Sequence, residues 1–110
     1  MIRLTADMWV SAYLARLRQE NIPAFITAKG DATAGAVLVK VNTLNGQARV
    51  FQRQFDLMSG DRIWDVLCEG PDPDVEAAIN RQKGFDPDLW VIELEHREGR
   101  HLLDEPGLAG

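Results

Sequence analysis

The sequence has a single cysteine, Cys68, among its 110 residues. An intrachain disulfide needs two cysteines, so the fold has to be held together by non-covalent packing. Proteins of this kind are typical of a reducing compartment, and we expect a cytoplasmic location. No apolar run approaches the roughly 18 residues of a membrane-spanning helix, and residues 1–7 have no sustained apolar stretch typical of a signal peptide. We therefore predict a soluble protein with no membrane partner.

Familiar catalytic and ligand-binding motifs are missing as well. The chain has no Gly-x-Ser-x-Gly elbow, no HExxH, no CxxC and no phosphate loop that ends in Gly-Lys-Ser/Thr. Without a convergent set of acid, base, nucleophile or metal ligand, we assign no catalytic residue, no metal site and no cofactor. The leading hypothesis is a non-catalytic interaction or accessory domain with an unknown partner.

What the chain does have is the composition of one globular domain, with 45% hydrophobic and 26% charged residues. Its charge is uneven: residues 1–60 carry seven basic and four acidic side chains, and residues 61–110 carry five basic and thirteen acidic ones. The net charge of −5 argues against indiscriminate nucleic-acid binding. Such asymmetry is usually a solvated surface, although it would also support contacts between two copies.

Hydrophobic spacing predicts two helices, one over residues 5–20 with Thr5 as N-cap and one that begins at Asp72 and stops at Gly84. Alternating and β-branched runs predict strands. They lie at 24–29, 36–42, 47–56, 62–69 and 89–96.

The element order α-β-β-β-β-α-β predicts an α+β fold over residues 1–103, with a mostly antiparallel sheet of about five strands and two helices. Residues 101–103 could pair back as a further short strand. Residues 104–110 lack periodicity, and we expect them to fray. An open sheet leaves edges that are often paired in a homodimer.

The strongest local signal is the pair Asn45-Gly46, which is typical of a tight hairpin turn. A loop of two or four residues would place Lys40 on the same face as alternate residues of the returning strand. Those residues are Arg49, Phe51 and Arg53. Three cations around an aromatic ring could bind single-stranded nucleic acid, because cations meet phosphates while the ring stacks on a base. The favoured interpretation is an ordinary solvated face.

Two histidines, His96 and His101, flank a predicted turn that contains Arg100. A two-residue turn would set the two imidazoles opposite each other, where they could bind a metal or exchange protons in a small enzyme. No third ligand stands at a recognised spacing, so a surface turn is the favoured interpretation.

A loop of small residues, with Gly30, Asp31 and Gly35, joins two predicted strands. It is not a phosphate loop, because a strand follows where a helix N-terminus should meet the phosphate. It is either a flexible loop that closes over a partner or, as we favour, a plain connector.

Four stretches of the chain together carry a resemblance. They are Ile22-Pro23-Ala24, Lys29-Gly30-Asp31 with 34–40, Phe85-Asp86-Pro87-Asp88-Leu89-Trp90, and Gly99-Arg100-His101-Leu102-Leu103-Asp104-Glu105. In these stretches the chain resembles a bacterial family of short uncharacterised proteins, the domain of unknown function 1491. The resemblance covers nearly the whole chain and implies a stand-alone domain of this length. It supplies no activity, cofactor or catalytic residue.

Overall fold

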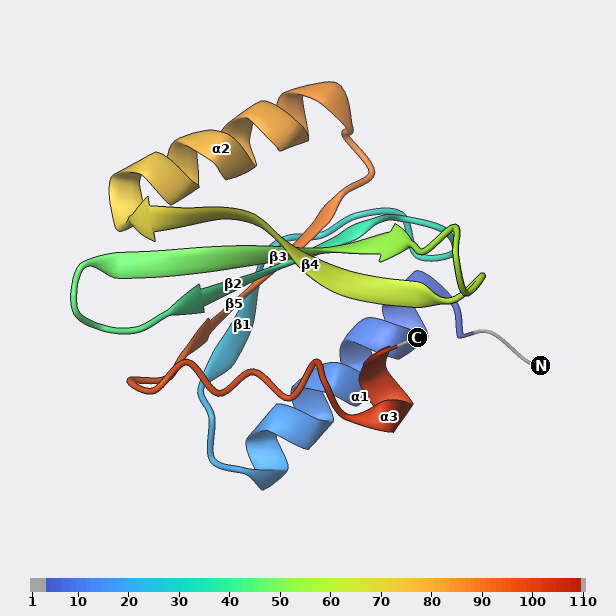
Figure 1. Ribbon diagram of the computed structural model, residues 1–110, viewed down its shortest axis with the longest axis horizontal. Helices are drawn as coiled ribbons and strands as arrows, with labels where there is room; N and C mark the ends of the chain where they lie inside the picture. Colours follow the sequence, from blue (N-terminus) through green and yellow to red (C-terminus); the bar gives the residue numbers. More distant parts are fainter. Residues whose placement is uncertain (1–3, 110) are drawn as a thin grey trace.

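The helices and strands form where the hydrophobic pattern predicts them, and a short third helix follows near the C-terminus. The computed structural model describes residues 4–109. Its elements are α1 (Ala6–Gln19), β1 (Ala24–Ala28), β2 (Val37–Asn42), β3 (Gln47–Phe55), β4 (Arg62–Pro71), α2 (Asp72–Phe85), β5 (Trp90–Glu95) and α3 (Pro106–Ala109) (Figure 1).

The five strands form one sheet in the order β1-β5-β2-β3-β4. Every neighbouring pair is antiparallel except β2 and β5, which are parallel. The predicted α+β class with a mostly antiparallel sheet is confirmed. The last strand in the sequence lies inside the sheet, where both of its faces are covered. This explains why four of its six residues are buried.

Two layers cover the sheet, one on each face (Figure 1). On the first, which we call the α1 face, side chains such as Val39 and Ile92 pack against α1 and the C-terminal segment 96–109. On the second, the α2 face, Val50 and Val91 pack against Ile79 and the rest of the apolar stripe of α2. Each side therefore has its own hydrophobic cluster.

The hairpin between β2 and β3 differs from the prediction in its loop length. Three residues, 44–46, separate Thr43 from Gln47, and the amide of Thr43 donates a hydrogen bond to the carbonyl of Gln47 at 3.3 Å. The side chain of Asn45 accepts a hydrogen bond from the amide of Gln47, which holds this odd-numbered loop. An odd loop shifts the register by one residue, so Lys40 lies opposite Val50. The prediction that Lys40 shares a face with Arg49, Phe51 and Arg53 is therefore wrong.

The C-terminal segment is packed, whereas the sequence predicted a further strand and a frayed tail. Residues 101–103 form no strand in the described part of the chain, and Leu103 is buried against the α1 cluster instead. The hydroxyl of Tyr13 donates to the carbonyl of His101 at 2.8 Å, and the indole of Trp64 donates to the carbonyl of Leu108 at 3.1 Å. These contacts place residues 101 and 108 against the core; Gly110 lies outside the described residues.

The loop between β1 and β2 is fixed on two sides. The amide of Asp31 donates to the carbonyl of Asp88 at 3.0 Å, and the indole of Trp90 donates back to the carbonyl of Asp31 at 2.8 Å. On the other side, the carbonyls of residues 32 and 33 accept hydrogen bonds from the first amides of α1, at Ala6 and Asp7. These amides have no partner within the helix, so the loop caps α1. The geometry is that of a fixed connector.

A buried lysine ties α2 to the sheet. Lys40 is 2% exposed, and its Nζ lies 2.6 Å from Asp72 Oδ1, in ion-pair contact with Glu76, and 3.5 Å from Glu93 Oε1. Burial alone lowers the pKa of Lys40, but the surrounding carboxylates more than offset this and raise the pKa above its usual value. The ammonium group therefore stays charged and anchors the first turns of α2.

The close approach at Gly30 generates a stability prediction. A Cβ atom on Gly30 would lie 2.1 Å from the carbonyl oxygen of Asp88 and 2.7 Å from the carbonyl carbon of Leu89, both backbone atoms. We expect Gly30→Ala to lower the free energy of unfolding by at least about 2 kcal/mol, since the backbones must separate. The matched control is Gly84→Ala in α2, which meets no atom within 4 Å. It should be neutral or stabilise by up to about 1 kcal/mol. Equal effects in urea denaturation would contradict the prediction.

The Lys40 cluster generates a second prediction, on pH dependence. We expect Lys40→Met to lower the free energy of unfolding by about 2 kcal/mol, because it leaves carboxylates without their cation. Since the folded-state pKa is raised, this contribution is complete below 10.5 and is lost as the pH rises through the folded-state pKa. The exposed Lys83 serves as control, and Lys83→Met should change stability by under about 0.5 kcal/mol. A difference already lost below pH 10.5 would contradict the prediction.

Candidate functional site

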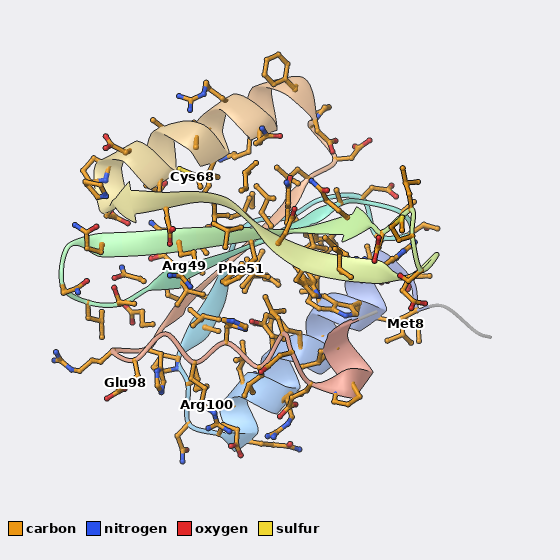
Figure 2. The ribbon with its side chains drawn as sticks, viewed as in Figure 1. Met8, Arg49, Phe51, Cys68, Glu98 and Arg100 are labelled. Atoms are coloured by element: carbon orange, nitrogen blue, oxygen red, sulfur yellow. The ribbon has the colours of Figure 1, made fainter. Side chains whose placement is uncertain are left out.

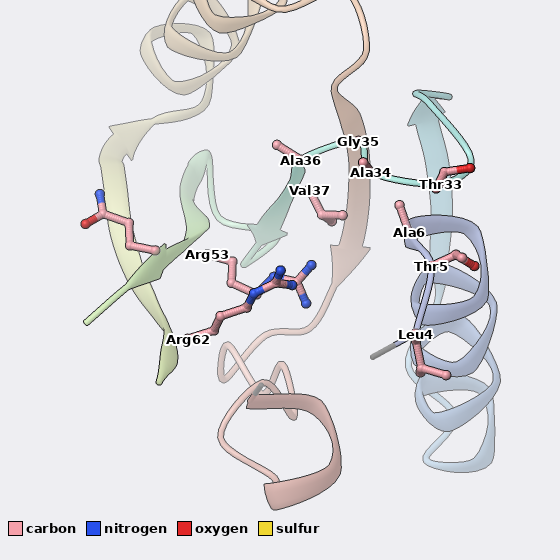
Figure 3. A pocket seen from close by; sticks show the side chains of 11 residues that line it. Leu4, Thr5, Ala6, Thr33, Ala34, Gly35, Ala36, Val37, Arg53 and Arg62 are labelled. Atoms are coloured by element: carbon pink, nitrogen blue, oxygen red, sulfur yellow. The ribbon is translucent and has the colours of Figure 1, made fainter. Parts of the chain in front are cut away.

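A cavity of about 500 Å³ lies between the start of α1, the end of the β1–β2 loop and the β3–β4 hairpin (Figure 3). We call it the arginine cavity. Its described lining consists of Leu4, Thr5, Ala6, Thr33, Ala34, Gly35, Ala36, Val37, Arg53, Gln54 and Arg62.

Two arginines from neighbouring strands enter this cavity. Arg53 of β3 pairs with Trp64, and Arg62 of β4 pairs with Phe55. Because alternate residues of a strand share a face, the two arginines are diagonal neighbours on the α1 face. Figure 3 shows both side chains extending from the hairpin into the cavity, toward the side formed by α1.

The side chain of Arg53 packs over the rings of Trp9 and Trp64. Its guanidinium carbon lies 5.4 Å from the ring centroid of Trp9 and 5.6 Å from that of Trp64. The two indoles contact each other at 5.3 Å, and Trp9 stacks on Tyr13 at 4.9 Å. A guanidinium over aromatic faces is attracted by the ring quadrupole and loses side-chain freedom before any ligand arrives. Arg53 is therefore preorganised.

The electrostatics of the cavity oppose those of the whole protein. The chain has a net charge of −5, yet the described lining contains two arginines and no aspartate or glutamate. Two other arginines of the described residues stand close to carboxylates: Arg49 Nε is 2.8 Å from Glu69, and Arg100 is 2.6 Å from Glu20. Two arginines on one sheet face form a local positive region, which attracts anions.

The start of α1 borders the cavity but contributes little to anion attraction. Its first two amides donate to the loop carbonyls, and the amide of Met8 donates to the carboxylate of Asp7 at 2.9 Å. The hydroxyl of Thr5 also donates to Asp7. The arginines are therefore the groups that would attract a negative charge, with Thr33 and Gln54 as neutral polar neighbours.

The two arginines give this lining groups that can bind an anion. It contains no histidine, cysteine or carboxylate among its described residues, so it offers no general base and no activated nucleophile. Within residues 4–109, no three His, Cys, Asp or Glu side chains gather as a metal site would require. In the same range, no helix has the length and apolar character needed to cross a membrane.

The predicted basic face is divided between the two sides of the sheet. Lys40 lies on the α2 face, while Arg49, Phe51 and Arg53 lie on the α1 face. Phe51 is only 8% exposed, and its ring centroid is 4.5 Å from that of His101 (Figure 2). A buried ring cannot stack on a base, so this face lacks the platform on which the nucleic-acid hypothesis depended.

Only Arg53 of the predicted face reaches the arginine cavity. Its partner there, Arg62, was not singled out from the sequence. The signal that could have found it is the parity of the β3–β4 hairpin, which sets Arg62 diagonal to Arg53 once the register is known.

The two histidines of the predicted cluster each accept hydrogen bonds from backbone amides close to them in the sequence. The Nδ1 atom of His96 accepts hydrogen bonds from the amides of Glu98 and Arg100 at 3.2 and 3.1 Å. The Nδ1 atom of His101 accepts one from Leu103 at 3.0 Å, and burial lowers the pKa of His101. The predicted hairpin that would set the imidazoles opposite each other does not form in the described residues.

Of the three residues predicted in the loop between β1 and β2, one lines the arginine cavity. Gly35 lines the arginine cavity, whereas Gly30 packs against Asp88. The carboxylate of Asp31 accepts hydrogen bonds from the amides of Thr33 and Ala34 at 3.2 and 2.9 Å, so it holds the loop in shape.

Solved structures share this architecture. The chain is similar to the crystal structure of a DUF1491 family protein from Caulobacter crescentus CB15, with 40% identity and a TM-score of 0.82 over 96% of this chain and 97% of that one. The NMR structure of a DUF1491 family protein from the same organism gives 41% identity and a TM-score of 0.82 over the same shares. Protein Atu0922 from A. tumefaciens is 26% identical, with a TM-score of 0.73 over 86% of each chain. No curated protein matches this sequence.

The family model agrees with these structures. The family described as "Protein of unknown function (DUF1491)" matches residues 4–104, which include α1, the whole sheet and α2. The resemblance carried by the four sequence stretches is thereby confirmed, and no function comes with it. The chain belongs to the DUF1491 family.

Proposed function

We propose that this protein is a non-catalytic binding domain for a small organic anion, held between Arg53 and Arg62. The observation that carries the proposal is the lining of the arginine cavity, which combines two arginines with no described carboxylate in an acidic protein. Guanidinium groups bind phosphates and carboxylates through paired hydrogen bonds, which are stronger than neutral ones. Two of them suit a dianionic group or two separate oxygens.

The size and walls of the cavity indicate what else the ligand carries. A volume of about 500 Å³ exceeds what a bare phosphate needs and lies in the range of sites for small organic molecules. The lining also contains Leu4, Ala6 and Val37, which are apolar. The ligand class is therefore a phosphate or carboxylate attached to a compact apolar body.

The absence of a general base in the described lining supports binding in preference to catalysis. A cytoplasmic location, which the single cysteine favours, would expose the domain to abundant phosphorylated and carboxylated metabolites. We propose an accessory role in which ligand occupancy is the signal.

A fluorescence titration tests this function. We expect phenyl phosphate to change the tryptophan emission, because Trp9 and Trp64 lie directly under Arg53. Arg62→Ala should weaken binding at least about tenfold, since a charge-assisted hydrogen bond is lost. The matched control is Arg81→Ala on the exposed side of α2, which should bind like the wild type. Calorimetry at two salt concentrations should show weaker binding at higher salt.

Three results would overturn the proposal. One is the absence of binding by phenyl phosphate, phenylacetate and inorganic phosphate alike. Another is binding that Arg62→Ala and Arg81→Ala reduce equally, which would indicate a general effect of charge. The third is binding that is insensitive to salt.

A further inference from the structure

The sheet ends on one side in a strand whose outer edge no element of residues 4–109 pairs with. β1 pairs with β5 alone and is the outermost strand on its side. Three consecutive residues of β1, Phe25, Ile26 and Thr27, are exposed. Phe25 is 45% exposed and Ile26 is 42% exposed. Because consecutive residues point to opposite faces, exposure of all three means that the outer edge itself is open.

The two edges of the sheet differ in their protection. β4, the opposite edge, carries Arg62, Asp65 and Glu69 and ends in Gly70-Pro71. Charges and proline on an edge strand are the usual means by which proteins prevent a further strand from pairing there. β1 has the sequence Ala-Phe-Ile-Thr-Ala, with neither a charge nor a proline. The edge at β1 therefore lacks these obstacles to pairing with a further strand.

We infer that two copies of this chain associate through β1, antiparallel about a twofold axis near Ile26, so that their sheets join into one. In this arrangement the strand is its own complement: Ile26 meets Ile26 of the second copy, and Phe25 meets Thr27. No charges face each other within the strand, and β-branched and aromatic pairs favour such contacts. This inference is independent of the proposed anion binding.

The apolar row of the α1 face supports a second copy as the occupant. Ile26 lies beside Ile92, which in turn lies beside Val39. Pairing at Ile26 continues this row into the second sheet and covers the exposed part of Ile26. A twofold contact is complete with two copies, whereas pairing of β1 with β4 of another copy could repeat indefinitely and build an open filament.

The extent of the edge sets the strength of the contact. β1 has five residues, and its register against β5 shifts between Ile26 and Ala28, which shortens the regular ladder. Stable complexes bury roughly 800 Å² per partner, over about 20–30 residues a side, whereas this edge offers one strand of five residues. We therefore expect a weak dimer that forms at high concentration.

Analytical ultracentrifugation over a concentration series tests the inference. The apparent mass of the wild type should rise from 12.3 kDa toward twice that value. Ile26→Glu should stay monomeric, because two carboxylates would meet at the axis. The matched control is Ile63→Glu on β4, since Ile63 has the same 42% exposure. It should associate like the wild type.

Thr27→Lys is the second variant, in case Ile26→Glu fails to fold by circular dichroism; an edge lysine should likewise prevent pairing. The inference is overturned if the wild type remains at 12.3 kDa up to about 1 mM, the concentration at which a dimer with a Kd of about 1 mM would be half formed. It is also overturned if Ile63→Glu abolishes association as completely as the β1 variants do.

Discussion

The contact on which the rest of the structure depends is that of one backbone lying directly on another at Gly30 and Gly35. Both glycines face the carbonyl of Asp88 at distances that leave no room for a Cβ atom. This contact places the start of β5 against the β1–β2 loop, so that β5 enters the sheet between β1 and β2. The same loop caps α1 with its outer carbonyls and forms one wall of the arginine cavity. One short loop thus sets the sheet order, the helix position and the site.

The local elements could be predicted from the sequence because their signals are local. Apolar spacing, turn residues and caps located both long helices and all five strands to within a few residues. The hairpin register could not be predicted, since it depends on whether the loop has an even or odd number of residues, and Asn45 supports the odd one. The packing of Leu108 was also missed, because it depends on a hydrogen bond to Trp64, which lies 44 residues away in the sequence.

The site was predicted only in part, for the same reason. Arg53 was identified as a residue of a basic face, but its true neighbour Arg62 follows from a register that no local pattern reveals. Lys40 looked like a surface cation because it alternates with valines in the sequence. Its burial becomes understandable only when the carboxylates of α2 and β5 surround it. A charge can be recognised from sequence, whereas its partners depend on tertiary structure.

The position of β5 inside the sheet has a consequence for how the chain is made. β5 follows the other four strands in the sequence, yet it lies between β1 and β2 in the sheet. Ala24 of β1 therefore has no partner until Leu94 of β5 has been made. Until residues 90–95 are in place, β1 has no partner strand, one side of β2 is unpaired, and both hydrophobic clusters are incomplete. Pairings this distant in sequence form slowly, and open edges favour aggregation. The nascent chain is therefore most vulnerable until β5 has taken its place, and at that stage a chaperone would protect it most.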